Sequence, residues 1–306
     1  MPKRSSARPR LLSHGRPANA KSTYSLTSAA TRSIIRKHHT LQKQLAAARR
    51  RQDATLVGAL SAQLEEDGGL AQYQAASTQG QACERGGDTS SVLVRWINDI
   101  LVDASPGHDC RKKPKIESTR WRLLEVGALS TGNACSKCGL FDVERIDLRS
   151  QNSGVKQQDF MQRPIPPSNP ASEGELFDVV SLSLVVNFVG DPAARGEMLR
   201  RVSSFLRNDG DEQVSSTSSA KAAPLSLLFL VLPAPCVTNS RYLDQARLGE
   251  IMNHLGFEMV RKKLSSKLIY YLWKFCRERV RKTKRVWKKE EIKKGANRNN
   301  FAIVLQ

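Results

Sequence analysis

The stretch RLLEVGALSTGNACSKCGLFDVERIDL, from Arg122 to Leu148, contains two apolar runs separated by a loop of small residues. Each run has the length of a buried strand; Gly127 follows the first run and Asp147 ends the second. Strand-like and helix-like segments alternate from residue 120 onward, which predicts a mostly parallel sheet covered on both faces. We therefore expect an α/β domain that binds its ligands at the carboxyl ends of its strands.

The spacing of Gly127 and Asp147 is typical of a nucleoside site. A glycine in the tight turn lets the backbone approach a ligand, and an acid 20 residues later can bind ribose hydroxyls. GxGxxG is absent, so the usual pyrophosphate cradle is missing, which favours a cofactor without a pyrophosphate, such as S-adenosylmethionine. Asp159 and Phe160 fall where a third strand could end, beside the amino group and ring of an adenine. The alternative is ordinary strand ends with turn residues.

Cys135 and Cys138 form a CxxC between the two runs. A structural zinc site needs four ligands, usually with a second CxxC or a pair of histidines at a defined spacing, and the sequence has neither. We therefore expect reduced cysteines on the helix after the first strand, and no metal. The six cysteines of the chain are too few for a disulfide scaffold.

A second stretch, FDVVSLSLVVNFVGDPAARGEML at residues 177–199, predicts a fourth strand that ends in an Asn-aromatic pair. Asn187 would present a carboxamide at the ligand edge of the sheet, and Phe188 would present a flat ring. This pair suits a planar base, because the amide can hydrogen-bond the edge of the base while the ring stacks on its face. The alternative is a strand-to-helix turn in which the asparagine is a cap.

Charge is unevenly distributed along the 306 residues, whose formal net charge is +20. Thirteen Lys/Arg and no acid precede Asp53, and fifteen Lys/Arg but only three Glu lie between Arg261 and Lys294. Clustered positive charge favours RNA as a partner; the alternative is a solvated charged helix. If KLIYYLWKF runs parallel to the core strands, the following basic segment emerges beside the cofactor. If it runs antiparallel, the segment leaves at the far end of the sheet.

The domain organisation follows from the shifts in composition. The regions that we expect are a basic disordered tail (1–27), a helical module (28–104), a linker (105–119) and the α/β domain (120–306), with loops at 150–175 and 207–224 and a basic segment at 276–299. Asp88 or Thr89 would cap a helix of the module. The most apolar run is shorter than the roughly 20 residues that span a membrane, so we expect a soluble, intracellular protein.

Several stretches carry a resemblance to a known family: EVGALSTGNACS, FDVERIDLRS, VVSLSLVVNFVGDPAARGEMLRR, GGLAQYQAASTQGQACERGGDTSSVLVRW and the closing ANRNNFAIVLQ. From about Leu64 to the carboxyl terminus, apart from the two loops, the sequence resembles the fungal nucleolar methyltransferases that form 1-methyladenosine in 25S ribosomal RNA. The resemblance implies a class I S-adenosylmethionine-dependent fold with a Rossmann-like sheet. It also implies ribosomal RNA in a pre-60S particle as substrate and a nucleolar location, and we expect a monomer.

The resemblance also implies which residues form the site. The cofactor contacts that it implies are Gly127, Asp147, Asp159, Phe160, Ser181 and, from the helical module, Arg85. The catalytic element of the family is Asn-Phe-Val-Pro, which corresponds to Asn187, Phe188 and Val189 here, with Gly190 where the proline is usual. We expect Asn187 to hold the edge of the target adenine and Phe188 to stack on its ring.

Two other functions remain open from the sequence. An animal relative of this family is a non-catalytic S-adenosylmethionine sensor that signals to the TOR kinase. A sensor needs the cofactor pocket but no RNA-binding surface, and this chain has both basic segments and the Asn187-Phe188 pair, which favours the enzyme. The third interpretation is an RNA-binding assembly factor whose methyltransferase domain has decayed.

Overall fold

The computed structural model describes residues 27–69, 72, 75–76, 88–103, 120–150, 152–167, 174–207, 225–281 and 285–306. The predicted tail up to residue 26, the linker, residues 208–224 of the second loop and Arg85 lie outside the described residues. The helices are α1 (Ser28–Arg50), α2 (Ala54–Glu66), α4 (Ser90–Asp103), α5 (Ala134–Lys137), α6 (Pro192–Val202), α7 (Pro235–Thr238) and α8 (Gln245–His254), with short 3-10 turns η3 (Ser203–Phe205) and η4 (Arg277–Arg279). The strands are β1 (Trp121–Val126), β2 (Phe141–Asp147), β3 (Lys156–Gln157), β4 (Val179–Ser183), β5 (Leu227–Pro233), β6 (Phe257–Leu264) and β7 (Leu268–Phe275).

These strands form one seven-stranded sheet in the order β3-β2-β1-β4-β5-β7-β6. The first five in this order are parallel, and β7 runs antiparallel to both β5 and β6. The result is the mostly parallel class I methyltransferase sheet that the sequence predicted. The strand order reverses between β1 and β4, because the chain continues from β1 to one side and from β4 to the other. In such a sheet the ligand crevice lies beyond the carboxyl ends of these two strands.

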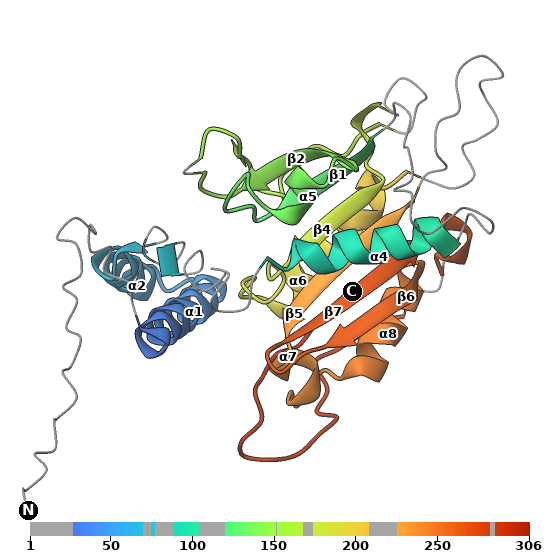
Figure 1. Ribbon diagram of the computed structural model, residues 1–306. Coiled ribbons are helices and arrows are strands. Elements are labelled where there is room, and N and C mark those ends of the chain that lie inside the picture. The colour runs from blue at the N-terminus through green and yellow to red at the C-terminus, as the bar shows by residue number, and fades with distance from the viewer. Residues whose placement is uncertain are drawn as a thin grey trace, which may run out of the picture.

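Helices cover both faces of the sheet, as the alternation of strands and helices predicted (Figure 1). On one face α4 lies across the strands, and the Trp96 ring meets the Phe229 ring of β5 edge-on, with 6.1 Å between the centroids. On the other face α6 and α8 bury Leu199 and Ile251 in the larger core. The side chains in both contacts are apolar and buried, so burial of this surface is the main source of stability.

The predicted helical module of residues 28–104 divides into two parts in the structure. Helices α1 and α2 pack on each other through a small apolar cluster that contains Leu41, Leu45 and Leu60. Helix α4 instead packs on the sheet, so it belongs to the core of the α/β domain. In Figure 1, α1 and α2 lie beyond the left end of the sheet, next to the loop between β4 and α6. The periodicity of α4 predicted a helix but could not show which partner covers its apolar face.

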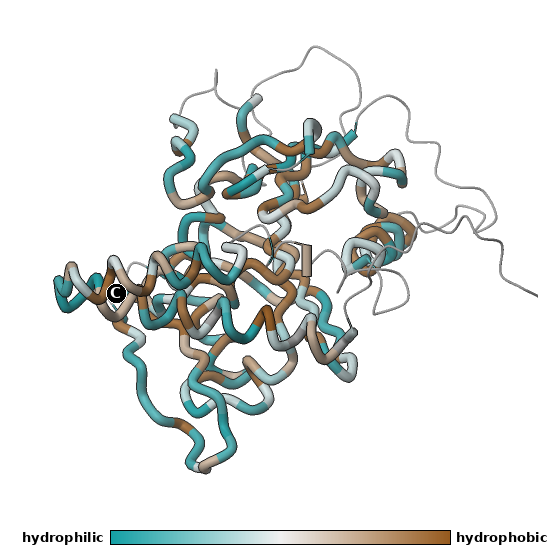
Figure 2. Tube along the Cα trace, turned by 90° about the vertical axis from the view of Figure 1, so that its left-hand side faces the viewer, coloured by the Kyte–Doolittle hydropathy of each residue, from teal (hydrophilic) through white to brown (hydrophobic). Residues whose placement is uncertain are grey.

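The basic segment 276–299 leaves the sheet at the far end, because β7 is antiparallel to β5. It then returns along α8. The Arg247 guanidinium donates to the Lys288 carbonyl (2.7 Å), the Ile292 amide to the Arg241 carbonyl (2.8 Å) and the Asn299 amide to the Asn239 carbonyl (3.0 Å). Asn239 follows α7, at the carboxyl end of β5. The later part of the segment therefore reaches the ligand end of the sheet; it is the long loop below α7 in Figure 1, and Figure 2 shows that most of it is hydrophilic.

The closing stretch ANRNNFAIVLQ does not join the seven-stranded sheet. Among the described residues it forms isolated bridges between Asn299 and Ser240 and between Leu305 and Trp287, and it packs along α6. The Val304 amide donates to the Pro192 carbonyl (2.9 Å), and Ile303 and Leu305 are buried. Gly196 makes this packing possible, because a Cβ at this position would lie 1.9 Å from the Val304 carbonyl oxygen.

We expect Gly196→Ala to lower the free energy of unfolding by about 2–3 kcal/mol, because the new methyl group would push the closing stretch away from α6. Gly249→Ala on α8 is the matched control. Apart from the local backbone of α8, no atom of the described residues lies within 4 Å of a Cβ at Gly249, so the same change should be neutral or stabilise by roughly 0.5–1 kcal/mol. Urea unfolding measures both. Equal stability of the two variants would contradict this packing.

Candidate active site

The turn after β1 brings the first predicted pair of residues together. Gly127 has a φ of 73°, in the left-handed region that glycine adopts most readily. Its amide donates to the Ile146 carbonyl on β2 (2.8 Å), which places the turn beside Asp147. A Cβ on Gly127 would lie 2.7 Å from Cγ2 of Val185, so the turn also touches the loop after β4.

The ends of β2 and β3 lie next to this turn. The Asp147 carbonyl accepts from the Gln158 amide (2.8 Å), and its carboxylate accepts from the Arg149 amide (2.9 Å). The Asp159 carboxylate accepts from the Met161 amide (2.8 Å) and thereby holds the turn that follows β3. The predicted acids therefore lie at neighbouring strand ends on the ligand edge of the sheet.

Phe160, predicted as a cofactor contact beside the adenine, directs its ring into the core. The side chain is 2% exposed and packs on Phe205, with 5.3 Å between the ring centroids, inside the core that α6 covers. Its carbonyl accepts from the Arg201 guanidinium (3.0 Å). The buried ring therefore anchors the turn after β3 to the core, and only the backbone of Phe160 can contact a ligand. The sequence could not distinguish these roles, because an aromatic residue after a strand suits both.

Ser181 is buried within β4, where its register partner on β1 is Glu125. Glu125 is a residue that the sequence analysis did not select. Its carboxylate accepts from the Asn133 amide (2.7 Å) and lies 3.9 Å from Nε of Arg145. Burial raises the pKa of Glu125, while Asn133 and Arg145 lower it. The signal in the sequence was present, since Glu125 is the acid in an otherwise apolar run just before Gly127.

The loop after β4 carries the predicted catalytic pair. It begins at Leu184, whose φ of 59° is unusual for a residue with a side chain and indicates local strain. The Phe188 amide then donates to the Val185 carbonyl (2.9 Å) and closes a tight turn around Asn187. Oδ1 of Asn187 is buried and has no hydrogen-bond partner among the described residues. A buried oxygen without a hydrogen bond lowers the stability of the fold, and a ligand that donates a hydrogen bond to it would remove this cost.

The start of α4 joins this loop to the turn after β1. The Asp88 carboxylate accepts from the Ser90 amide (2.9 Å), as predicted for a helix cap, and also from the Ala134 amide at the start of α5. The Thr89 hydroxyl hydrogen-bonds the Ser183 hydroxyl at the end of β4 (2.8 Å). Both residues that the sequence offered as caps therefore fasten α4 to the ligand edge.

Gly190, which stands where the resembled family has proline, faces α1. A Cβ on Gly190 would lie 3.7 Å from the Gln42 carbonyl oxygen and 3.8 Å from Cβ of Ala46, which is ordinary contact. Asp191, the next residue, forms an ion pair with Arg50 at the end of α1 and caps α6 by accepting from the Ala193 and Ala194 amides (3.0 Å each). Helix α1 therefore touches the loop that carries Asn187.

The cysteines of the CxxC lie on and just after α5, the helix that follows β1, as predicted. Both are free; Cys135 is buried, and burial raises the pKa of its thiol. Among the residues that the structure describes, no three His, Cys, Asp or Glu side chains gather in a way that could hold a metal ion. Within the same residues, no helix is long and apolar enough to cross a membrane.

Comparison with known proteins identifies the family. The family model for 25S rRNA (adenine(2142)-N(1))-methyltransferase, Bmt2, matches residues 58–303. The chain belongs to this family. It is 40% identical over 238 residues to the 25S rRNA adenine-N(1) methyltransferase of Schizosaccharomyces pombe, covering 78% of this chain and 77% of the relative. It is 37% identical over 252 residues to the 25S rRNA (adenine(2142)-N(1))-methyltransferase of Saccharomyces cerevisiae, covering 82% of this chain and 64% of the relative.

Among solved structures, the 1,6-didemethyltoxoflavin-N1-methyltransferase of Burkholderia thailandensis, with bound 1,6-didemethyltoxoflavin and S-adenosylhomocysteine, is 11% identical with a TM-score of 0.41. It covers 68% of this chain and 88% of its own. An rRNA methylase from Escherichia coli is 11% identical with a TM-score of 0.36, covering 79% of this chain and 91% of its own. Such scores are too low to support an inference about ligands.

The family confirms the predicted activity and cofactor: this adenine-N1 methyltransferase of 25S rRNA uses S-adenosylmethionine. The residues at the ligand edge fit such a cofactor. The turn at Gly127 carries no side chain, and even a Cβ there would collide with Val185. Carboxylates at the ends of neighbouring strands are suitable acceptors for ribose hydroxyls and for an adenine amino group. Both the non-catalytic sensor and the decayed assembly factor are therefore disfavoured.

Proposed function

We propose that the turn at Asn187 and Phe188 is where this methyltransferase holds its target adenine. The observation that carries the proposal is the buried Oδ1 of Asn187, which lacks a partner among the described residues. A carboxamide oxygen accepts from an exocyclic amino group, and in adenine that group is next to N1. Phe188 lies one residue further, where its ring can stack on the face of the base.

The chemistry asks little of the protein beyond positioning. Adenine N1 has its own lone pair and needs no general base, and the cofactor supplies an electrophilic methyl group. Holding the base in line, with the reacting atoms about 3–3.5 Å apart, supplies most of the rate enhancement. N1 lies on the Watson–Crick edge of adenine, so the target base must be unpaired or flipped out of its helix before it enters the turn.

For the cofactor, we propose contacts with Gly127, Asp147, Asp159, Ser181 and the backbone of Phe160. The turn at Gly127 supports this, because it presents bare backbone beside the loop that carries Asn187. Asp147 would accept from the ribose hydroxyls and Asp159 from the adenine amino group. Ser181 on β4 and Glu125 on β1 are paired neighbours in the sheet, and they place two polar side chains just before the turn at Gly127. The predicted contact from Arg85 lies outside the described residues.

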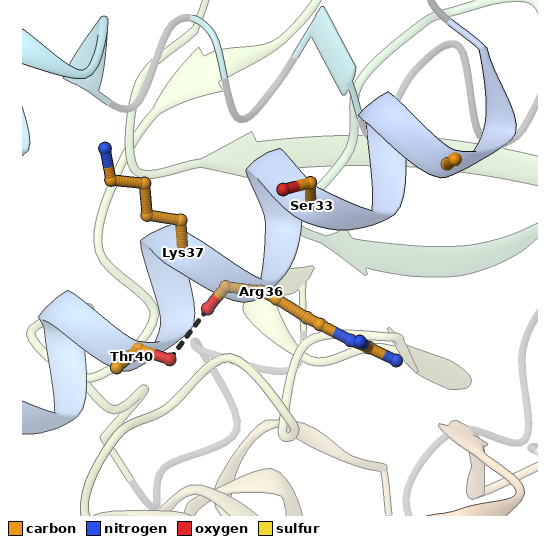
Figure 3. A pocket seen from close by; sticks show the side chains of 5 residues that line it. Ser33, Arg36, Lys37 and Thr40 are labelled. Atoms are coloured by element: carbon orange, nitrogen blue, oxygen red, sulfur yellow. Dashed lines mark hydrogen bonds between the residues drawn. The ribbon is translucent and has the colours of Figure 1, made fainter.

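We propose that the RNA approaches across the ligand end of the sheet, between α1 and the returning part of the basic segment. Helix α1 contains six Lys/Arg and no acid. A hollow of about 660 Å³ runs along it, and Figure 3 shows Ser33, Arg36, Lys37 and Thr40 projecting from the helix around it. Lys43 lies near α7, because its charge acts on the thiol of Cys236 in that helix. Burial raises the pKa of this thiol to about 12, although the charges of Arg195 and Lys43 act to lower the pKa.

We expect Arg36→Glu combined with Lys43→Glu to weaken binding of large-subunit rRNA about tenfold at moderate salt, and to lower the salt slope of binding by roughly 0.7–0.9 for each phosphate that is no longer neutralised. Filter binding over a salt series measures both. Arg277→Glu combined with Arg279→Glu, at the opposite end of the sheet, changes the net charge by the same amount and is the matched control. If it weakens binding as much as the α1 variant does, the RNA does not follow this path.

We propose further that the target is the adenine that corresponds to position 2142 of the relatives, that the substrate is a pre-60S particle, and that the protein works as a monomer in the nucleolus. The family and the basic surface support this setting. A tagged chain should co-sediment with pre-60S particles and overlap with a nucleolar marker. Sedimentation with mature ribosomes alone would contradict the proposal.

The test of the reaction is single-turnover transfer of labelled methyl groups from S-adenosylmethionine to unmodified large-subunit rRNA. Nucleoside digestion and mass spectrometry identify the product, and primer extension locates it. The expected product is 1-methyladenosine at one position. Another methylated nucleoside would overturn the assignment of adenine N1.

A further inference from the structure

Arg195 is a buried cation that joins two distant parts of the chain. It lies in the first turns of α6 and is 2% exposed. Its Nε donates to the Val189 carbonyl (2.8 Å), and its Nη1 donates to the Ala302 carbonyl (2.7 Å). The guanidinium also lies over the Phe301 ring, 4.3 Å from the centroid.

A charge this deeply buried is unfavourable for stability alone, because removal from water penalises the cation. Burial lowers the pKa of Arg195 to about 10, so the side chain still carries its charge at neutral pH. It forms no salt bridge with a described residue, and the acceptors of its Nε and Nη1 are the backbone carbonyls of Val189 and Ala302. An apolar side chain would fill this space without the penalty of removing a charge from water. What an apolar side chain could not provide is the pair of hydrogen bonds to the Val189 and Ala302 carbonyls.

The two carbonyls belong to functionally different segments. Val189 is two residues after Asn187, in the loop that carries the catalytic pair. Ala302 belongs to the closing stretch, which lies against Gly196 on α6 and is continuous with the basic segment. The planar, rigid guanidinium holds the distance between the two carbonyls more tightly than a flexible ammonium group could.

We propose that Arg195 is a positioning residue for methyl transfer: it holds the Val189 carbonyl against the closing stretch and thereby sets the position of Asn187 and Phe188. The proposal rests on the role proposed above for that pair. It makes the last residues of the chain a structural part of the active site, through the contact of Ala302 with Arg195. The closing stretch follows the basic segment directly. The same segment of chain therefore carries part of the proposed RNA-binding surface and, through Arg195, fixes the position of the catalytic turn.

The experiment compares Arg195→Met and Arg195→Lys with Arg200→Met in the full-length chain. Arg200 is the matched control, because it also lies on α6 and also binds the closing stretch, through the Gln306 carbonyl, but its other partner is Glu197 and not the catalytic loop. The readouts are kcat and KM for rRNA, the dissociation constant of S-adenosylmethionine, the melting temperature and hydrogen exchange of the amides at residues 186–190.

For Arg195→Met we expect kcat to fall by about 30- to 100-fold, because a small displacement of the base is enough for a loss of this size. The affinity for S-adenosylmethionine should stay within about twofold, and exchange should accelerate at residues 186–190 but not in β1 or β5. Arg195→Lys keeps the charge and can still donate to at least one carbonyl, so it should fold and recover part of kcat. Arg200→Met should keep kcat within about threefold of wild type.

A folded Arg195→Lys or Arg195→Met variant with wild-type kcat would overturn the proposal. So would a loss of kcat that comes with an equal loss of cofactor affinity and faster exchange throughout the domain, because this pattern indicates general destabilisation. Asn187→Ala keeps the two proposals separate. If that variant retains full activity, the role of the catalytic turn is wrong, whatever Arg195 does.

Discussion

Asn187→Ala should lower kcat by about 100-fold or more while the affinity for S-adenosylmethionine stays within about threefold. The substitution removes the buried acceptor that lacks a partner among the described residues, and with it the group that we propose to orient the adenine edge. The turn itself should survive, because the bond that closes it joins the backbones of Phe188 and Val185. Single-turnover transfer at saturating cofactor measures kcat, and calorimetry measures cofactor binding.

Asn187→Asp is the informative companion variant. It keeps an acceptor of the same shape and loses the amide donor, so it separates the need for an acceptor from the need for the whole carboxamide. If both variants transfer methyl groups at nearly the wild-type rate, Asn187 does not orient the base, and its orphan oxygen requires another explanation. If both lose cofactor binding, the turn belongs to the cofactor pocket.

Gly127→Arg should abolish detectable binding of S-adenosylmethionine. The glycine has a φ of 73°, which strains any side chain, and its Cβ would lie 2.7 Å from Cγ2 of Val185. The rest of an arginine side chain would then fill the space where backbone should approach the cofactor. Isothermal titration with S-adenosylmethionine measures the effect, and circular dichroism checks that the variant is folded.

Gly139→Arg provides a control with the same backbone strain. Gly139 has a φ of 77°, but beyond its chain neighbours no atom in the described part of the chain lies within 4 Å of a Cβ at this position, so the new side chain can point into open space. Its cofactor affinity should remain near that of wild type. Near-wild-type binding by Gly127→Arg, measured beside this control, would show that the cofactor lies elsewhere.

The sequence predicted much of this molecule from local patterns. Apolar runs of strand length alternating with helical segments were enough for a mostly parallel sheet, because burial on both faces imposes that pattern on each strand separately. Gly127 and Asp147 could be placed at the ligand edge because parallel strands end at a common edge. The Asn187-Phe188 pair was selected for the same reason, and the family resemblance agreed.

Other features could not be read from the sequence, because long-range packing decides them. The Phe160 ring packs on Phe205 in the core, a contact across about forty-five positions of sequence that no local pattern reports. Glu125 was passed over, since its importance appears only when Asn133 and Arg145 surround it. The direction of β7 was left as two alternatives, because an apolar strand reads alike in both directions. The chain in fact leaves at the far end and returns.

The sequence by itself therefore determined the sheet, the ligand edge and the chemical character of the residues along it, because these depend on period, length and residue type. Only the tertiary structure decided what supports that edge. Asp88 fastens α4 to α5, and Arg195 binds both the nearby Val189 and Ala302, which is 107 positions further along the chain. Such contacts depend on how separate segments meet in space, and the energy that selects them is spread over the packed core rather than encoded in either segment alone.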